Sequence, residues 1–281
     1  MISIIICSRE PYIHESLKNN INETVGVDYE LIVINNSKNE YSIFQAYNLG
    51  VSRAKYPYLC FMHEDILFHT QDWGQTIKRH FEDETIGLIG FAGTNYLPKV
   101  PTYWFTSPFI SEYNLTNDGG KSIECFHSDF FHEKTIVDVV ACDGFCMFIR
   151  KELFNEILFD EKTFTGFHYY DMDICMQVLA IKYRVCVCKD VLIEHFWSEN
   201  KVKAGMNYFI FNQDLFFNKW KSYFPISCGI DEIPPYILER VNLLYNVAYD
   251  AKKVRNSKAY RIGKFILAPF RFLSNIRNRV K

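Results

Sequence analysis

Two adjacent acidic residues, Glu64 and Asp65, directly follow His63 and an apolar run at residues 58–62. A carboxylate at the end of a buried strand is costly unless it binds a cation or accepts hydrogen bonds. A hard divalent ion that also contacts phosphate oxygens is one use of such a pair. A solvated turn or a helix cap is the other interpretation that these two residues allow.

Strands and helices that could position this pair alternate over the first 90 residues. Runs that are apolar over most of their length predict buried strands at 2–7, 30–34, 58–62 and 86–91. Helical spacing between them predicts helices at 14–21, 42–54 and 72–81, with Ser42 and Asp72 as N-caps. The order predicts an α/β fold with a mostly parallel central sheet and helices on both faces.

Ligands of such sheets bind beyond the carboxyl ends of the strands. The residues at three of these ends are Cys7, Ser8 and Arg9, then Asn35, Asn36 and Ser37, then His63, Glu64 and Asp65. We therefore expect a binding site where these three segments meet.

The second half of the chain is less regular. Residues 93–135 combine prolines and glycines with many aromatic side chains, which predicts an irregular insertion that lines or covers a site. The pattern then predicts strands at 136–142, 145–149, 184–188 and 191–196, and helices at 171–181, 206–220 and 235–251.

The formal charge of −2 hides an uneven distribution. Residues 252–281 contain ten Lys or Arg and no acid, so the preceding residues carry −12. Helical spacing from Arg261 onward places apolar residues on one face and basic residues on the other, with Pro269 as a kink. We expect this tail to bind an anionic membrane surface, a partner or its own domain, and no nucleic acid.

Nine cysteines, an odd number, lie mostly in apolar runs, which favours a reducing compartment. We interpret Cys142, Cys146, Cys186 and Cys188 as core residues rather than zinc ligands. The sequence starts with a strand-like run and contains no apolar run of membrane-spanning length. We therefore expect a cytoplasmic protein, peripheral at the inner face of the plasma membrane.

Several motifs occur in a characteristic order along residues 2–197. They are Asn48-Leu49-Gly50 with Ala54, then His63-Glu64-Asp65, then Asp143 to Lys151, then Tyr170-Asp171-Met172-Asp173, and finally Glu194-His195. This order resembles family 2 glycosyltransferases of the GT-A fold, and is most similar to a bacterial branch whose metal motif begins with His. The resemblance implies a catalytic domain at 1–200, a helical extension at 201–251 and the basic tail at 252–281.

The resemblance also implies roles for individual residues. Asp65 and His195 would ligate Mg²⁺ or Mn²⁺, Asp171 would be the general base, and Glu64 would bind the ribose or a metal-bound water. Nucleotide-sugar contacts fall on Cys7, Ser8, Arg9, Asn35, Asn36, Ser37, Asn48 and Glu64, and acceptor-side contacts on Trp104, Asp143, Gly144 and His168. The implied reaction is a metal-dependent, inverting transfer of a hexose-like sugar to a hydroxyl.

Departures from the family pattern leave alternatives open. Asn35 and Asn36 replace an acidic pair, which leaves UDP-linked and dTDP-linked donors equally open, and His63 and Tyr170 replace acids. The acceptor would be a saccharide or a lipid-linked saccharide in surface glycan or polysaccharide biosynthesis. The alternatives are a catalytically silent protein of this fold that binds saccharide or nucleotide, and a nucleotidyltransferase. A purely structural role is also open for two of the site residues. Asp171 would then cap its helix, and His195 would be a core residue.

Overall fold

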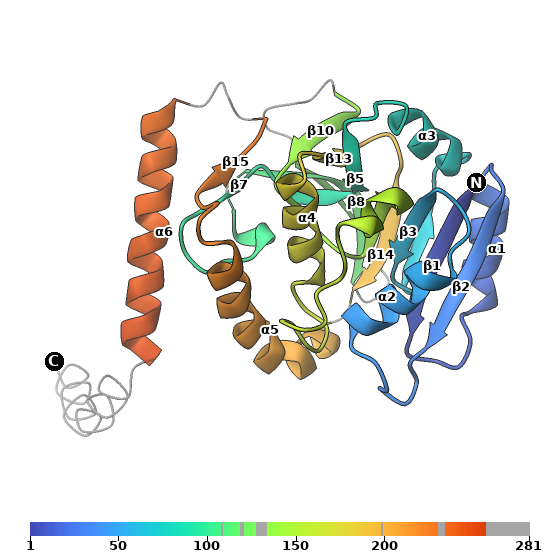
Figure 1. The fold of residues 1–281 in the computed structure, drawn as a ribbon, viewed down its shortest axis with the longest axis horizontal. Coiled ribbons are helices and arrows are strands. Elements are labelled where there is room, and N and C mark those ends of the chain that lie inside the picture. The colour runs from blue at the N-terminus through green and yellow to red at the C-terminus, as the bar shows by residue number, and fades with distance from the viewer. Residues whose placement is uncertain (108, 119–120, 128–133, 198, 230–233, 257–281) are drawn as a thin grey trace, which may run out of the picture. The chain divides into compact units, whose positions relative to one another are not determined.

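A computed structural model describes residues 1–107, 109–118, 121–127, 134–197, 199–229 and 234–256 (Figure 1). The chain divides into two compact units. The first consists of Met1–Leu97 and Pro101–Glu232, and the second of Pro98–Val100 and Ile233–Lys281. All of the candidate site residues lie in the first unit.

The core of the first unit is a seven-stranded sheet, drawn in Figure 1 with β2 on the right of the view. Its strands in spatial order are β10 (Ile136–Val139), β13 (Arg184–Cys188), β5 (Ile86–Gly90), β12 (Cys146–Arg150), β3 (Tyr58–Met62), β1 (Ile2–Ser8) and β2 (Tyr29–Asn35). The pairings are parallel for β1 with β2, β1 with β3 and β5 with β13, and antiparallel around β12 and β10. Five strands therefore run in one direction, which confirms the predicted α/β class with a mostly parallel sheet.

Four of the predicted helices are present in the first unit with similar bounds. They are α1 (Glu15–Thr24), α2 (Ile43–Arg53), α3 (Trp73–His80) and α4 (Tyr170–Ala180). Ser42 forms the predicted cap of α2, in a capping box with Gln45. Asp72 occupies the predicted N-cap position of α3, but its backbone is left-handed with φ 55° and its side chain caps no helix N–H.

A second, six-stranded sheet was not predicted. Its main path is β11 (Ala141–Cys142), β6 (Ala92–Thr94), β8 (Ile110–Asp118), β14 (Ile193–Trp197) and β4 (Ile66–Phe68), and β9 (Lys121–His127) pairs with β8. The interpretation of residues 93–135 as an irregular insertion is therefore wrong in part. Strand β8 carries Ser, Glu, Asn, Thr and Asp, so it lacks the apolar run that identifies a buried strand.

Short elements complete the first unit. A two-stranded sheet joins β7 (Tyr96–Leu97) to β15 (Ile226–Ser227), and 3₁₀ turns span Trp104–Thr106 and Lys151–Asn155. Helix α5 (Glu199–Trp220) begins seven residues before its predicted start. The four cysteines assigned to the core are fully buried free thiols, as predicted.

The second unit contains α6 (Pro235–Asn256), which extends five residues beyond its predicted end. The remainder of the predicted basic tail, residues 257–281, lies outside the described residues. Among the helices that are described, none is both long and apolar enough to cross a membrane.

Candidate active site

Three potential metal ligands, His63, Asp65 and His195, come together in the first unit and form what we call the metal-ligand group. One donor atom from each lies within 4.8 Å of the others. His195 Nε2 is 3.6 Å, and His63 Nδ1 3.8 Å, from Asp65 Oδ1. All three side chains are about one-fifth exposed, so the group faces solvent through one side.

The second sheet is what brings Asp65 and His195 together, although 130 residues separate them in the sequence. Strand β4 starts immediately after Asp65 and pairs antiparallel with β14, where His195 lies opposite Ile66. The Phe196 N–H donates to the Asp65 carbonyl at 2.9 Å and extends this pairing to Asp65 itself. The His195 ring is fixed by stacking on Phe145, with ring centres 5.0 Å apart.

His63 was predicted to lie at the binding site but was not among the predicted metal ligands, and the structure adds it to the candidate ligands. Its Nε2 lies 2.8 Å from the Tyr170 hydroxyl, which also donates to the Gly144 carbonyl at 3.0 Å. A phenol has a single proton, so both contacts are satisfied when Tyr170 donates to Gly144 and His63 Nε2–H donates to Tyr170. His63 Nδ1 then carries a lone pair toward Asp65, as a metal ligand requires.

Gly144 permits this arrangement. A Cβ at that position would lie 2.2 Å from the Tyr170 hydroxyl oxygen and 2.4 Å from Cζ, which no side chain can occupy. The predicted acceptor-side residue Gly144 therefore has a packing role, because it lets the phenol reach the carbonyl that orients it.

Glu64 lies beside the metal-ligand group and connects two of the predicted strand ends. Ser8 Oγ donates to Glu64 Oε2 at 2.6 Å, and Arg9 Nε lies 3.1 Å from Glu64 Oε1. The Arg9 guanidinium also lies 3.9 Å from Asp65. Arg9 is more than half exposed, so a cation faces solvent next to the acidic pair.

The second predicted strand end, at the end of β2, forms a loop in which most side-chain hydrogen bonds stay within residues 35–41. Asn35 Oδ1 accepts from the backbone N–H and hydroxyl of Ser37, at 3.0 and 2.7 Å. The Asn36 amide bonds both the N–H and the carbonyl of Tyr41 and lies 3.7 Å from Cys7 Sγ. Burial raises the pKa of the Cys7 thiol to about 11, so this thiol is protonated at neutral pH.

Asn48 lies apart from these residues. Its amide donates to the Phe159 carbonyl at 2.8 Å and to Glu161 at 3.0 Å, while its oxygen accepts from the Phe159 N–H at 3.1 Å. Asn48 thus holds the segment at residues 159–161 against α2, and its predicted nucleotide-sugar contact stays a prediction.

Asp171 lies in the first turn of α4 and is 2% exposed. Its Oδ2 accepts from the Tyr103 hydroxyl at 2.6 Å, and its Oδ1 from the Met172 N–H at 2.9 Å. Burial, together with the charge of Asp143, raises the pKa of Asp171 to about 7. A carboxyl with such a pKa exchanges its proton in the neutral range, which suits a general base.

Asp143, which is partly buried, is the second carboxyl near Asp171. It accepts from Trp104 Nε1 at 3.1 Å and from the Phe145 N–H at 2.9 Å. Burial raises the pKa of Asp143, while the nearby His195 opposes that rise. The pair therefore links Asp171 electrostatically to the metal-ligand group.

Tyr169, two residues before Asp171, has a left-handed backbone conformation with φ 73°, which is strained for a bulky residue. Its hydroxyl donates to the Thr102 carbonyl at 3.0 Å, and its ring packs on Tyr103 and Phe209. Asn212 of α5 binds the carbonyl of the preceding His168 at 2.9 Å. Burial lowers the pKa of His168, so its imidazole is neutral at pH 7.

Asp173, two residues after Asp171 in α4, has a different environment from Asp171. Its carboxylate accepts from Trp220 Nε1 and Gln177 Nε2, both at 2.7 Å, and lies 2.8 Å from Lys219 Nζ. These contacts give Asp173 a structural hydrogen-bonding role. They also separate it from Asp171, whose hydrogen-bond partners lie on the side of Tyr103.

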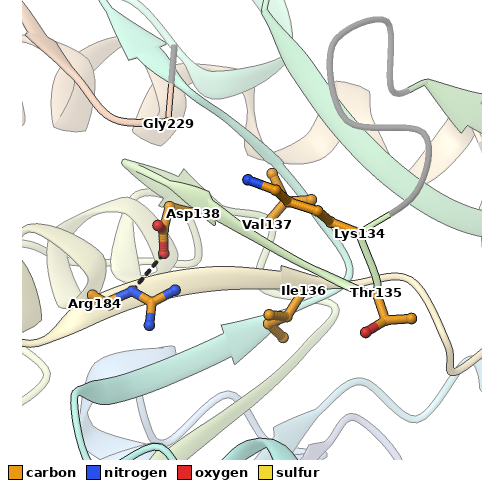
Figure 2. Close-up of a pocket in the computed structure, with 7 residues that line it drawn as sticks. All are labelled: Lys134, Thr135, Ile136, Val137, Asp138, Arg184 and Gly229. Atoms are coloured by element: carbon orange, nitrogen blue, oxygen red, sulfur yellow. Dashed lines mark hydrogen bonds and ion pairs between the residues drawn. The ribbon is translucent and has the colours of Figure 1, made fainter. Parts of the chain in front are cut away.

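A pocket of about 420 Å³ lies elsewhere, at the edge strand β10 (Figure 2). Its lining residues are Lys134, Thr135, Ile136, Val137, Asp138, Arg184 and Gly229. Arg184 crosses it to contact Asp138 at 2.7 Å and also binds Asp83 at 2.7 Å. None of the predicted site residues lines it.

Comparisons with known proteins identify relatives of this chain. Residues 3–220 match the family described as Glycosyltransferase like family. Among solved structures, A197 from STIV is similar at 17% identity and a TM-score of 0.42, over 70% of this chain and 86% of that chain. GalNAc-T7, solved with UDP, GalNAc and Mn²⁺, is similar at 11% identity and a TM-score of 0.47, over 70% of this chain and 43% of that chain. No curated protein matches.

Proposed function

This chain belongs to the glycosyltransferase-like family, in the family 2-like group, and we propose that it transfers a sugar from a nucleotide diphosphate-sugar to an acceptor hydroxyl. The observation that carries the proposal is the juxtaposition of two systems. One is the solvent-facing group His63, Asp65 and His195, and the other is the carboxyl pair of the partly buried Asp143 and the buried Asp171.

The donor set of the first group fits a divalent cation. Two imidazoles and a carboxylate offer nitrogen and oxygen ligands on a partly exposed edge, where water and phosphate oxygens can complete the coordination. The two imidazoles favour Mn²⁺ over Mg²⁺, which prefers oxygen ligands alone. Such an ion, when bound, supplies a Lewis acid that stabilises negative charge on the leaving nucleoside diphosphate.

The chain's own residues would handle the donor and the proton. Arg9 contributes positive charge beside Asp65, where the diphosphate would lie, and Glu64 faces the same edge from its contacts with Ser8. Asp171, once ionised, accepts the proton of the acceptor hydroxyl as its oxygen attacks the anomeric carbon, with inversion of configuration.

Access to Asp171 requires movement of an aromatic cover. Tyr103 donates to Asp171, and Trp104 donates to Asp143, so these two side chains occupy the acceptor side of both carboxyls. An acceptor hydroxyl that replaces the Tyr103 hydroxyl would take over its hydrogen bond to Oδ2. Trp104 would then lie against the acceptor sugar.

The pathway is proposed from the sequence. A saccharide or lipid-linked acceptor in surface glycan biosynthesis, at the inner face of the plasma membrane, accords with the ten basic residues at 252–281.

Thermal unfolding with nucleoside diphosphates tests the donor class and the metal role together. We expect UDP or dTDP with Mn²⁺ to raise the melting temperature of the wild type, because a ligand that binds only the folded state stabilises it. The shift should disappear in Asp65→Ala and persist in the control Asp72→Asn. An equal shift in Asp65→Ala would refute the metal role, and no shift with any nucleotide would refute the donor class.

A further inference from the structure

A second group of potential metal ligands, His80, Cys188 and Asp190, lies apart from the candidate active site. One donor atom from each lies within 4.8 Å of the other two. Asp190 connects them: its Oδ1 is 2.9 Å from His80 Nε2 and accepts from the Cys188 thiol at 2.9 Å. In this arrangement two protons, one on sulfur and one on nitrogen, occupy the space between three ligand atoms.

The three residues come from the ends of two elements that meet. His80 is the last residue of α3, Cys188 is the last residue of β13, and Asp190 follows two residues later. Cys188 is fully buried, whereas the side chains of His80 and Asp190 are 11% and 23% exposed. An ion could therefore enter from the solvent side and reach a thiol that is otherwise enclosed.

The chemistry of this group differs from that of the active site. A thiolate, an imidazole and a carboxylate are the ligands of tetrahedral zinc sites, with bonds of about 2.0–2.3 Å. Burial raises the pKa of Cys188, so without metal the sulfur holds its proton, which a coordinated ion displaces. Arg79, 3.3 Å from Asp190, is the cation that competes for the same carboxylate.

We propose that His80, Cys188 and Asp190 bind Zn²⁺, with water as the fourth ligand, and that the ion fastens the end of α3 to the end of β13. Binding releases the Cys188 proton and the proton between His80 and Asp190 to solvent, with no change in oxidation state. The sequence indicated that Cys188 is a core residue rather than a zinc ligand; the structure confirms its burial, and the proposal departs from that interpretation because His80 and Asp190 lie beside the thiol. The site does not depend on the proposed function.

Cobalt titration of the metal-free full-length chain tests this site, because only a thiolate ligand gives Co²⁺ a sulfur-to-metal charge-transfer band in the near ultraviolet. We expect the wild type to develop this band at one equivalent of Co²⁺. Ions at His63, Asp65 and His195 have no thiolate ligand and would not contribute. Adding Zn²⁺ should abolish the band and raise the melting temperature.

Variants assign the band to this group. Cys188→Ser should lose it, and the neighbouring Cys186→Ser, matched in strand and burial, should keep it. His80→Gln, on the solvent side, should remain folded by circular dichroism and bind Co²⁺ at least about tenfold more weakly. A folded wild type without the band, a band that survives Cys188→Ser, or unchanged affinity in His80→Gln would each overturn the proposal.

Discussion

A single tyrosine connects the metal-ligand group to the segments that carry Asp143 and Asp171. The Tyr170 hydroxyl lies 2.8 Å from His63 Nε2 and 3.0 Å from the Gly144 carbonyl, and Asp171 is the next residue in the chain. In the family pattern that the sequence resembles, this position holds an acid. Here the phenol replaces a charge with a hydrogen bond that selects the tautomer of His63.

Removing that hydrogen bond should weaken metal binding. We expect Tyr170→Phe to lower Mn²⁺ affinity about tenfold, because partners that orient a metal-ligating histidine contribute on this scale. The free Mn²⁺ signal in electron paramagnetic resonance measures the affinity without any reaction. Tyr58→Phe, on β3 at the opposite end from His63, should bind Mn²⁺ like the wild type. Equal affinity in all three proteins would contradict the assigned role of Tyr170.

The environment of Asp171 predicts pKa changes of opposite sign. The Tyr103 hydroxyl stabilises ionised Asp171, so Tyr103→Phe should raise the pKa of Asp171 above its value of about 7. The charge of Asp143 opposes ionisation, so Asp143→Asn should lower it. We expect each change to be about one unit, and carbon-13 NMR of the labelled carboxyl measures both. Shifts in the same direction would contradict this electrostatic description.

Some of these residues could be predicted from the sequence and others could not. Asp65, Asp171 and His195 belong to motifs in a recognisable order, and the structure places Asp65 and His195 together. His63 was a departure from the motif, and only its proximity to Tyr170 and His195 makes it a candidate ligand. Tyr103 had no signal beyond its aromatic type, because its contact with Asp171 spans 68 residues.

At the scale of elements, the second sheet determines the site. The pairing of β4 with β14 brings Asp65, which directly precedes β4, to His195 in β14. The pairing of β6 with β11 positions the turn at Asp143 and Gly144. The sequence predicted the strands of the first sheet because they are apolar over most of their length. It missed β8 and β9 because polar residues interrupt any apolar run in them.

The turn at Gly144 should tolerate no side chain. In Gly144→Ala the new Cβ would overlap Tyr170, and we expect a loss of about 1–3 kcal/mol of unfolding free energy, measured by urea denaturation. The double variant Gly144→Ala/Tyr170→Phe removes the nearest clashing atom, so its loss should be smaller than the sum of the single losses. Strictly additive losses would show that Gly144 and Tyr170 do not interact.

At the scale of the whole molecule, the charge separates a body of −12 from a tail of +10. This asymmetry was evident from the sequence alone, and it assigns different tasks to the two parts. Surplus acid in the body accords with a cation-dependent site, whereas basic residues close to an anionic surface contribute about 1 kcal/mol each.

Truncation after Asn256 tests the tail, since it removes seven of its ten basic residues and retains every described helix and strand. We expect the full chain to sediment with vesicles rich in anionic lipid and the truncated chain to stay in the supernatant, while neither binds neutral vesicles. Sedimentation of the truncated chain with anionic vesicles would contradict a membrane-binding tail.

We propose that Asp171 removes the acceptor proton at a site assembled beside a metal-dependent donor site. Paired measurements on Asp171→Asn test it most directly: nucleoside diphosphate binding with Mn²⁺ by calorimetry, and sugar transfer by product analysis. We expect unchanged binding, and a transfer rate at least about 10²-fold lower, which is the scale of general-base catalysis. Transfer at the wild-type rate by Asp171→Asn would contradict it.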